Sequence, residues 1–81
     1  MNIRQAIQDT MELAHKSQIT EYPIPDLSYD HLCNMHERID LNRDWSDTKL
    51  CRWLGWMQAA VVSWGVYTLE DMKAINMRNA G

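Results

Sequence analysis

The sequence predicts an all-α fold, a compact bundle of four helices that forms a single domain over residues 1–81. Apolar residues recur at helical spacing in four segments, and a residue suited to helix capping precedes each segment. Prolines, a glycine and polar residues separate the segments. Apolar residues make up 46% of the chain, which is enough for one core, whereas 81 residues are too few for two.

The first helix is expected over about residues 3–18, with Asn2 as its N-cap. Its apolar positions recur every three or four residues, as one buried face requires. They are Ile3, Ala6, Ile7, Met11 and Ala14.

Two prolines stiffen the connector over residues 19–27. Pro23 and Pro25 lack an amide donor and hold the residues before them in extended backbone. Tyr22 and Ile24, which precede the prolines, are expected to pack on the helices.

The second helix is expected from about 29 to 39 or 40. Ser28 can cap it, and Leu27 can contact Leu32 across the cap as a hydrophobic staple. The residues it buries are predicted to be Leu32, Met35 and Ile39.

The third helix, at about 47–64, is predicted to be the central element. Ser46 is its expected N-cap, and Gly65 suits the left-handed conformation after its last turn. Its wide apolar arc consists of Leu50, Trp53, Leu54, Trp56, Met57, Ala60, Val61 and Trp64. The small residues Gly55, Ala59 and Ser63 lie opposite and predict a close approach by another backbone.

The fourth helix is expected over about 69–78. Thr68 and Asp71 resemble a capping box at its start. Its predicted buried residues are Leu69, Met72 and Ile75.

The charge of the chain disfavours nucleic acid as a partner. The formal net charge is −3, from 11 acidic and 8 basic residues. Residues 26–44 hold five carboxylates against two guanidiniums, so the middle of the chain is its acidic part. Such a stretch repels phosphate backbones but can steer a basic protein surface toward it.

Cysteine usage and hydropathy favour a cytoplasmic protein. Cys33 and Cys51 form neither a CxxC pair nor a disulfide framework, which fits a reducing compartment. No apolar signal core follows Met1, and the most apolar run, residues 53–67, is too short to span a bilayer. No membrane association is expected.

Histidines and a cysteine gather on the second predicted helix. Cys33 and His36 lie on one face, near His31, and could touch the same metal ion. A structural zinc site needs four ligands, so His15 and Cys51 would have to converge from other helices. No metal site is predicted.

Enzyme motifs are missing from the sequence. Ser28, Asp30 and His31 are suitable residue types, but no nucleophile elbow or paired-carboxylate spacing frames them. Three glycines are too few for a phosphate-binding loop. The prediction is a protein that is not an enzyme and holds no cofactor.

Four tryptophans are too many for so small a core to hide completely. Trp53 and Trp64 are the expected core members. Trp56, at the edge of the apolar arc, or Trp45, in the connection before the third helix, could anchor a partner, since tryptophan is enriched in interface hot spots.

Two runs of sequence resemble the C-terminal half of small accessory proteins encoded by tailed bacteriophages. They are Lys49-Leu50-Cys51-Arg52-Trp53-Leu54-Gly55-Trp56-Met57-Gln58 and Gly65-Val66-Tyr67-Thr68-Leu69-Glu70-Asp71-Met72. The resemblance implies a protein that acts in the host cytoplasm and binds, modulates or inhibits a host or defence protein. It carries over no catalytic or binding residue.

The leading hypothesis is therefore a non-enzymatic protein that contacts another protein through its acidic stretch and adjoining aromatic residues. The predicted contact residues are Tyr22, Tyr29, Asp30, Glu37, Asp40, Asp44, Trp45 and Trp56. One alternative is a helix-turn-helix-like nucleic-acid-binding regulator that uses residues 49–79. Another is a homodimeric structural protein whose surplus tryptophan surface forms the dimer seam.

Overall fold

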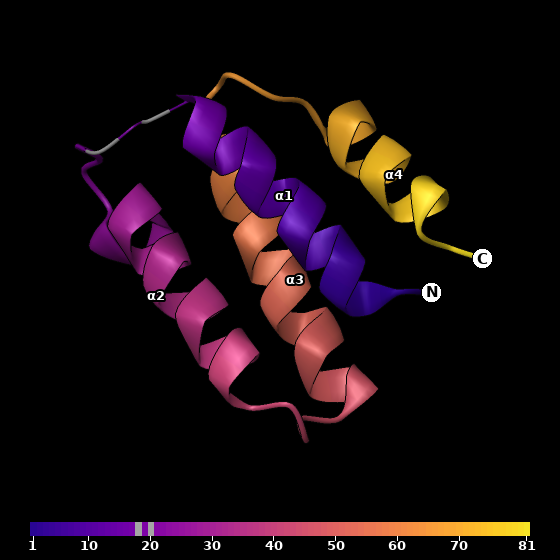
Figure 1. Cartoon of the computed structure of the whole chain (residues 1–81). Helices are drawn as coiled ribbons and strands as arrows, with labels where there is room; N and C mark the ends of the chain where they lie inside the picture. Colours follow the sequence, from indigo (N-terminus) through magenta and orange to yellow (C-terminus); the bar gives the residue numbers. More distant parts are fainter. Residues whose placement is uncertain (18, 20) are drawn as a thin grey trace.

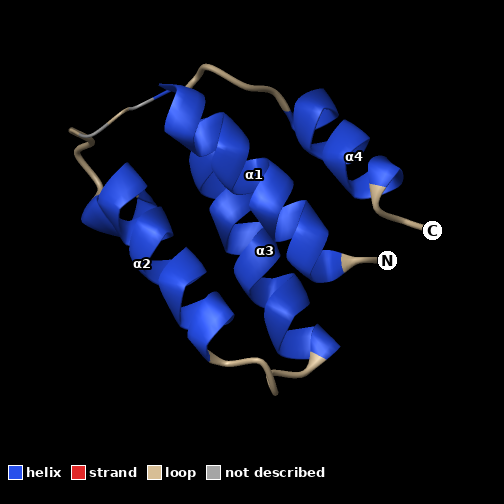
Figure 2. Ribbon diagram, viewed as in Figure 1, coloured by secondary structure: helices blue, strands red, loops and turns tan. Residues whose placement is uncertain are grey.

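The computed structural model describes residues 1–17, 19 and 21–81. Over these residues the chain forms four α-helices, one short 3-10 helix and no strand (Figure 2). In chain order they are α1 (Ile3–Ser17), η1 (Pro25–Leu27), α2 (Tyr29–Leu41), α3 (Asp47–Ser63) and α4 (Leu69–Arg78). The predicted all-α class is confirmed, with helix ends that agree within one or two residues; residue 18, the expected end of the first helix, lies outside the described residues.

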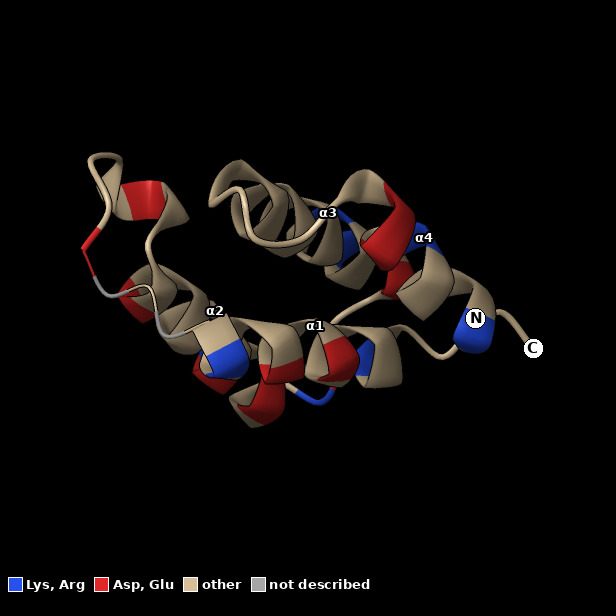
Figure 3. Ribbon diagram, turned by 90° about the horizontal axis from the view of Figure 1, so that it is seen from above, with Lys and Arg blue, Asp and Glu red and all other residues tan. Residues whose placement is uncertain are grey.

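The helix α3 lies at the centre, packed along α1, as predicted (Figure 1). The helix α2 flanks this pair on one side, while α4 lies on the other side against α1. Seen from above, α1 and α2 form one layer and α3 lies over them (Figure 3). None of the described helices combines the length and the apolar character needed to cross a bilayer.

Each α-helix begins after a side chain that accepts a hydrogen bond from the backbone N–H three residues later. These caps are Asn2, Ser28, Ser46 and Thr68, with donor to acceptor distances of 3.1, 3.2, 3.2 and 3.2 Å. The Asp71 carboxylate accepts from the Thr68 N–H at 2.8 Å and completes the capping box. Gly65 has φ of 80°, a conformation that glycine adopts without strain. The predicted helix boundaries are thus confirmed through their local chemistry.

The core draws apolar side chains from all four α-helices. Its buried members are Ile3, Ala6, Ile7, Met11, Ala14, Leu32, Met35, Ile39, Leu50, Leu54, Met57, Ala60, Val61, Trp64, Met72 and Ile75. One predicted member, Leu69, is wrong because it is 61% exposed, and Trp53, also expected in the core, is only half-buried and packs against it. Trp56, at the edge of the predicted arc, is 47% exposed. Leu69 is the first residue of α4, which packs against α1 through later residues, and Trp56 faces the side of α3 that α2 leaves open. Ile24 is exposed as well, because the chain bends at Pro23 and Ile24 before entering η1.

The small-residue face of α3 is not covered by another backbone. Gly55, Ala59 and Ser63 are exposed, and a Cβ added to Gly55 would meet no heavy atom within 4 Å. The predicted close approach is therefore wrong within this chain. The physical reason is that α4, the nearest candidate, packs against α1 instead.

Polar side chains bind α4 to the rest of the bundle. The Gln58 amide donates to Asn76 Oδ1 at 2.9 Å and to the Thr10 hydroxyl at 3.3 Å, and Asn76 donates back to Gln58 Oε1 at 3.2 Å. Gln58 is only 9% exposed. Among the described residues, no buried side-chain nitrogen or oxygen lacks a hydrogen-bond partner. Such a network satisfies buried polar groups that would otherwise cost stability.

A second network joins α1 to the end of α4. The Asp9 carboxylate accepts hydrogen bonds from Asn79 at 3.0 Å, from Arg78 at 3.2 Å and from Gln5 at 2.9 Å. The hydrogen bonds from Asn79 and Gln5, with help from Arg78, lower the pKa of Asp9. The Asn2 N–H also donates to the Asn79 carbonyl at 2.7 Å.

Candidate functional site

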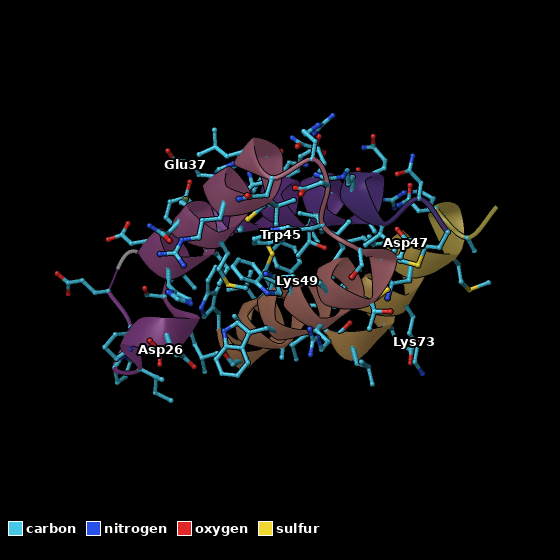
Figure 4. All side chains as sticks on the ribbon, turned by 90° about the horizontal axis from the view of Figure 1, so that it is seen from below. Asp26, Glu37, Trp45, Asp47, Lys49 and Lys73 are labelled. Carbon is cyan, nitrogen blue, oxygen red and sulfur yellow. The ribbon has the colours of Figure 1, made fainter. Side chains whose placement is uncertain are left out.

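A groove lies between α2 and α3, and η1 closes it at one end. We call it the α2–α3 groove. Its volume is about 850 Å³, and it is lined by Pro25, Asp26, Ser28, Asp30, His31, Asn34, Met35, Arg38, Arg52, Trp53 and Trp56. Viewed from below, Asp26 lies at the η1 end, and Trp45 and Lys49 lie between the two helices toward the other end (Figure 4).

The wall formed by α2 is polar because of its helical spacing. Asp30, Asn34 and Arg38 are four residues apart and therefore share one helix face. All three are exposed, while Leu32 and Ile39 enter the core from another face of the same helix. The helix α2 thus attaches to the bundle by its apolar face and leaves a row of polar groups along the groove.

The wall formed by α3 is aromatic. The Trp56 indole N–H donates to the Asp26 carbonyl at 3.0 Å, which fixes the ring although it is 47% exposed. Trp53 is half-buried, and Trp45 packs edge-on against it with ring centroids 4.6 Å apart. The Lys49 ammonium lies 4.0 Å from the centroid of the Trp45 ring, a cation–π arrangement. These contacts hold the aromatic wall in one geometry.

A further tryptophan fixes the closed end of the groove. The Trp64 indole, buried in the core, donates to the Leu27 carbonyl at 2.8 Å. Together with the Trp56 bond to Asp26, it fastens η1 to α3 at two points. The closed end is therefore positioned by α3 rather than by the connector.

Opposite charges occupy opposite ends of the groove. Asp26 and Asp30 lie at the η1 end, while Arg38, late in α2, and Arg52, early in α3, lie toward the connector between these antiparallel helices. Neither guanidinium forms an ion pair with a carboxylate of the described residues. The groove therefore offers unneutralised charge next to an aromatic wall.

The groove brings together two of the predicted contact residues, Asp30 and Trp56. Trp45 contributes indirectly through its packing against Trp53. Tyr22 is half-buried, and its hydroxyl donates to the Ser63 carbonyl at 3.0 Å, so it secures the connector to the end of α3.

The other predicted contact residues lie elsewhere. Glu37 lies on the side of α2 away from α3 (Figure 4), Asp40 lies 3.7 Å from His36 on the same helix, and Asp44 is in the connector. Tyr29 is half-buried, and its hydroxyl forms a hydrogen bond with His15 Nδ1. A hydrogen bond with Cys33, with burial and the charge of Asp30, raises the pKa of Tyr29. Of the predicted acidic residues, the groove therefore contains Asp30 but not Glu37, Asp40 or Asp44.

Residue types suited to catalysis or metal binding either have structural roles or are not grouped into a site within the described part of the chain. The Ser28 hydroxyl donates to the Pro25 carbonyl at 2.7 Å and accepts from the His31 N–H, so both functions serve the helix start. Within the described part of the chain, no three His, Cys, Asp or Glu side chains are grouped so that they could hold a metal ion. Cys33 is half-buried and Cys51 is exposed, and both are free thiols.

The predicted contact residues did not include most of the polar residues of the groove. Those absent from the prediction are Asn34 and Arg38 on α2, Arg52 on α3 and Asp26 at the closed end. A local signal existed, since Asp30, Asn34 and Arg38 repeat every four residues. Their juxtaposition with Arg52 depends on the pairing of two helices and has no local signal.

No protein-family model, no curated protein and no solved structure matches this chain.

Proposed function

We propose that this protein is not an enzyme and that it binds another protein through the α2–α3 groove, with Trp56 as the central contact. One observation carries the proposal: Trp56 is half-exposed in a groove, yet its indole is fixed by a hydrogen bond to the Asp26 carbonyl. An aromatic side chain that is already ordered loses little conformational entropy when a partner covers it. Tryptophan at such a position is typical of interface hot spots.

The charges of α4 favour a protein over a nucleic acid as the partner. Lys73 pairs with Glu70 at 3.4 Å, and Arg78 pairs with Asp9 at 3.2 Å. A helix inserted into a DNA groove needs cations that are available for phosphates. Each basic residue of this helix lies beside a carboxylate, so α4 offers phosphates no excess of positive charge, which weighs against a helix-turn-helix-like regulator.

The resemblance to small bacteriophage accessory proteins suggests the class of partner. On that basis we propose a host or defence protein in the bacterial cytoplasm, which this chain modulates or inhibits by contact. A small, rigid groove suits this role, because it can cover a functional segment of a larger protein without any chemistry of its own.

The test is a pull-down from bacterial lysate with immobilised wild-type protein, Trp56→Ala and Leu69→Ala. Leu69 is the matched control, an exposed large apolar residue outside the groove. Captured proteins are identified by mass spectrometry, and the affinity of the purified partner is then measured. We expect Trp56→Ala to weaken binding more than about tenfold and Leu69→Ala to leave it unchanged.

The reverse result would contradict the proposal. If Leu69→Ala loses the partner and Trp56→Ala retains it, the uncovered face around Gly55 and Ala59 is the interface instead. Light scattering of the same variants separates this outcome from self-association. A dimer that Leu69→Ala dissociates would identify a homodimeric protein.

A further inference from the structure

We infer that the segment bound in the α2–α3 groove carries a carboxylate beside a large apolar side chain, and that Arg38 and Arg52 bind this carboxylate. The inference rests on the proposed function and specifies the chemistry of its partner. It arises from the charges that the groove leaves without an intramolecular partner.

Several cations of this protein are engaged within the chain. Arg4 donates to the carbonyls of Ile39 and Asn42, both at 3.0 Å, and Lys49 lies over Trp45. The two basic residues of α4 pair with carboxylates. Arg38 and Arg52 differ, because they line one groove from two facing helices and neither forms an ion pair with a described carboxylate.

Two guanidiniums that share a groove repel each other unless an anion lies between them. Each guanidinium offers a planar fork of N–H donors that matches a carboxylate. Trp56 offers an apolar contact in the same groove. The group that satisfies all three side chains is a carboxylate carried next to an apolar side chain.

The carboxylates at the η1 end of the groove disfavour a ligand that is negatively charged along its whole length. Asp26 and Asp30 would repel a polyanion that ran along the whole groove, such as a nucleic acid strand. A peptide can place one carboxylate at the arginine end and neutral or basic groups at the η1 end. Charge complementarity therefore selects a protein segment with this polarity.

The spacing of Arg52 and Trp56 along α3 predicts the separation of the carboxylate and the apolar side chain in the ligand. Arg52 and Trp56 are four residues apart, which is about 6 Å along a helix axis. Two residues of an extended peptide span about the same distance, as do four residues of a helical one. The acidic residue of the ligand should thus lie two to four positions from its apolar residue.

The experiment selects binders from a displayed library of random dodecapeptides. The library is applied to immobilised wild-type protein, Trp56→Ala, the double variant Arg38→Gln with Arg52→Gln, and a control double variant. The control, Lys16→Gln with Arg43→Gln, removes the same charge from exposed positions outside the groove. Circular dichroism establishes that each variant is folded.

We expect wild-type binders to combine Trp, Phe or Leu with Asp or Glu at this spacing. Replacing the acidic residue of a selected synthetic peptide by its amide should weaken binding about 10- to 100-fold. The Arg38 and Arg52 double variant should lose this discrimination, whereas the control variant should retain it.

Failure of the inference differs from failure of the proposed function. Peptides that require Trp56 but show no acidic preference, or bind equally well as amides, would overturn the carboxylate inference and leave the groove as a protein-binding site. The absence of any Trp56-dependent peptide would reject both. Stronger binding of a fluorescent single-stranded oligonucleotide, lost in the Arg38 and Arg52 variant, would show that the arginines bind phosphate instead.

Discussion

The two sides of α3 differ in how they use polar side chains. Toward α1 and α4, the Gln58 amide forms hydrogen bonds with Thr10 and Asn76. Among the described residues, no buried side-chain nitrogen or oxygen lacks a hydrogen-bond partner. Toward α2, the groove leaves Arg38 and Arg52 without an ion-pair partner among the described residues. One side contributes stability, and the other keeps groups available for binding.

The difference follows from burial. A polar group inside the bundle must be satisfied within the chain, because leaving it unpaired costs about 1–3 kcal/mol. A polar group in an open groove is solvated and carries no such cost. The comparison therefore predicts that changes on the α4 side reduce stability, whereas changes in the groove affect binding alone.

Trp64 contributes both to the core and to the closed end of the groove, so its replacement should have the largest effect. Its ring is buried in the core, and its indole N–H holds the Leu27 carbonyl at the closed end of the groove. Trp64→Ala should lower the free energy of unfolding by about 3–5 kcal/mol. Urea denaturation provides the measurement. A loss below about 1 kcal/mol would mean that this ring is not a core member.

Gln58→Ala should have the next largest effect, about 1–3 kcal/mol, because Thr10 and Asn76 lose a buried partner. Thermal unfolding followed by circular dichroism should show a clear decrease in Tm. Gln8→Ala, on the exposed face of α1, is the control and should change stability by less than about 0.5 kcal/mol. Equal effects of the two changes would show that the Gln58 network does not stabilise α4.

Asp9→Asn should destabilise the protein by about 1 kcal/mol at pH 7, with an effect that depends on pH. The fold lowers the pKa of Asp9, so its ionised form stabilises the folded state. This contribution is fully present above the unfolded value of 3.8 and is lost as the pH falls through the lower folded pKa. Unfolding of the wild type and the variant should therefore converge in acid. Glu12→Gln, at an exposed position of α1, is the control and should change the free energy of unfolding at pH 7 by less than about 0.5 kcal/mol.

The smallest effect on stability is expected from the double variant Arg38→Gln with Arg52→Gln. Both side chains are exposed and form no ion pair with described residues, so the free energy of unfolding should change by less than about 0.5 kcal/mol. Urea denaturation measures it. A loss above 1 kcal/mol would show that these arginines support the fold and that the two sides of α3 do not differ as described.

Local sequence patterns were sufficient to predict the helices. Ser28 and Ser46 were found from their position before an apolar pattern, and Thr68 with Asp71 from their spacing, because capping depends on residues three positions apart. Helix packing was less predictable. The side of the bundle that α4 joins depends on contacts such as Arg78 to Asp9, between residues 69 positions apart.

The same limit explains what was missed at the groove. The apolar arc has Trp56 at its edge, and whether that edge is covered depends on how α2 packs against α3. Arg38 and Arg52 belong to different helices, and their juxtaposition follows from the antiparallel pairing of α2 with α3. The predicted contact residues Glu37, Asp40 and Asp44 remain a prediction for a second face.

The hydrogen bond from the Asn2 N–H to the Asn79 carbonyl holds residues near the two ends of the chain together, at the side of the bundle away from α2 (Figure 1). Its consequence is mechanical. A pulling force applied at Met1 and Gly81 would act first on the contact between α1 and α4. It would separate these two helices before it acted on α2. The same geometry makes either end a suitable point for a fluorophore or a surface tether, since the groove then faces away from the attachment.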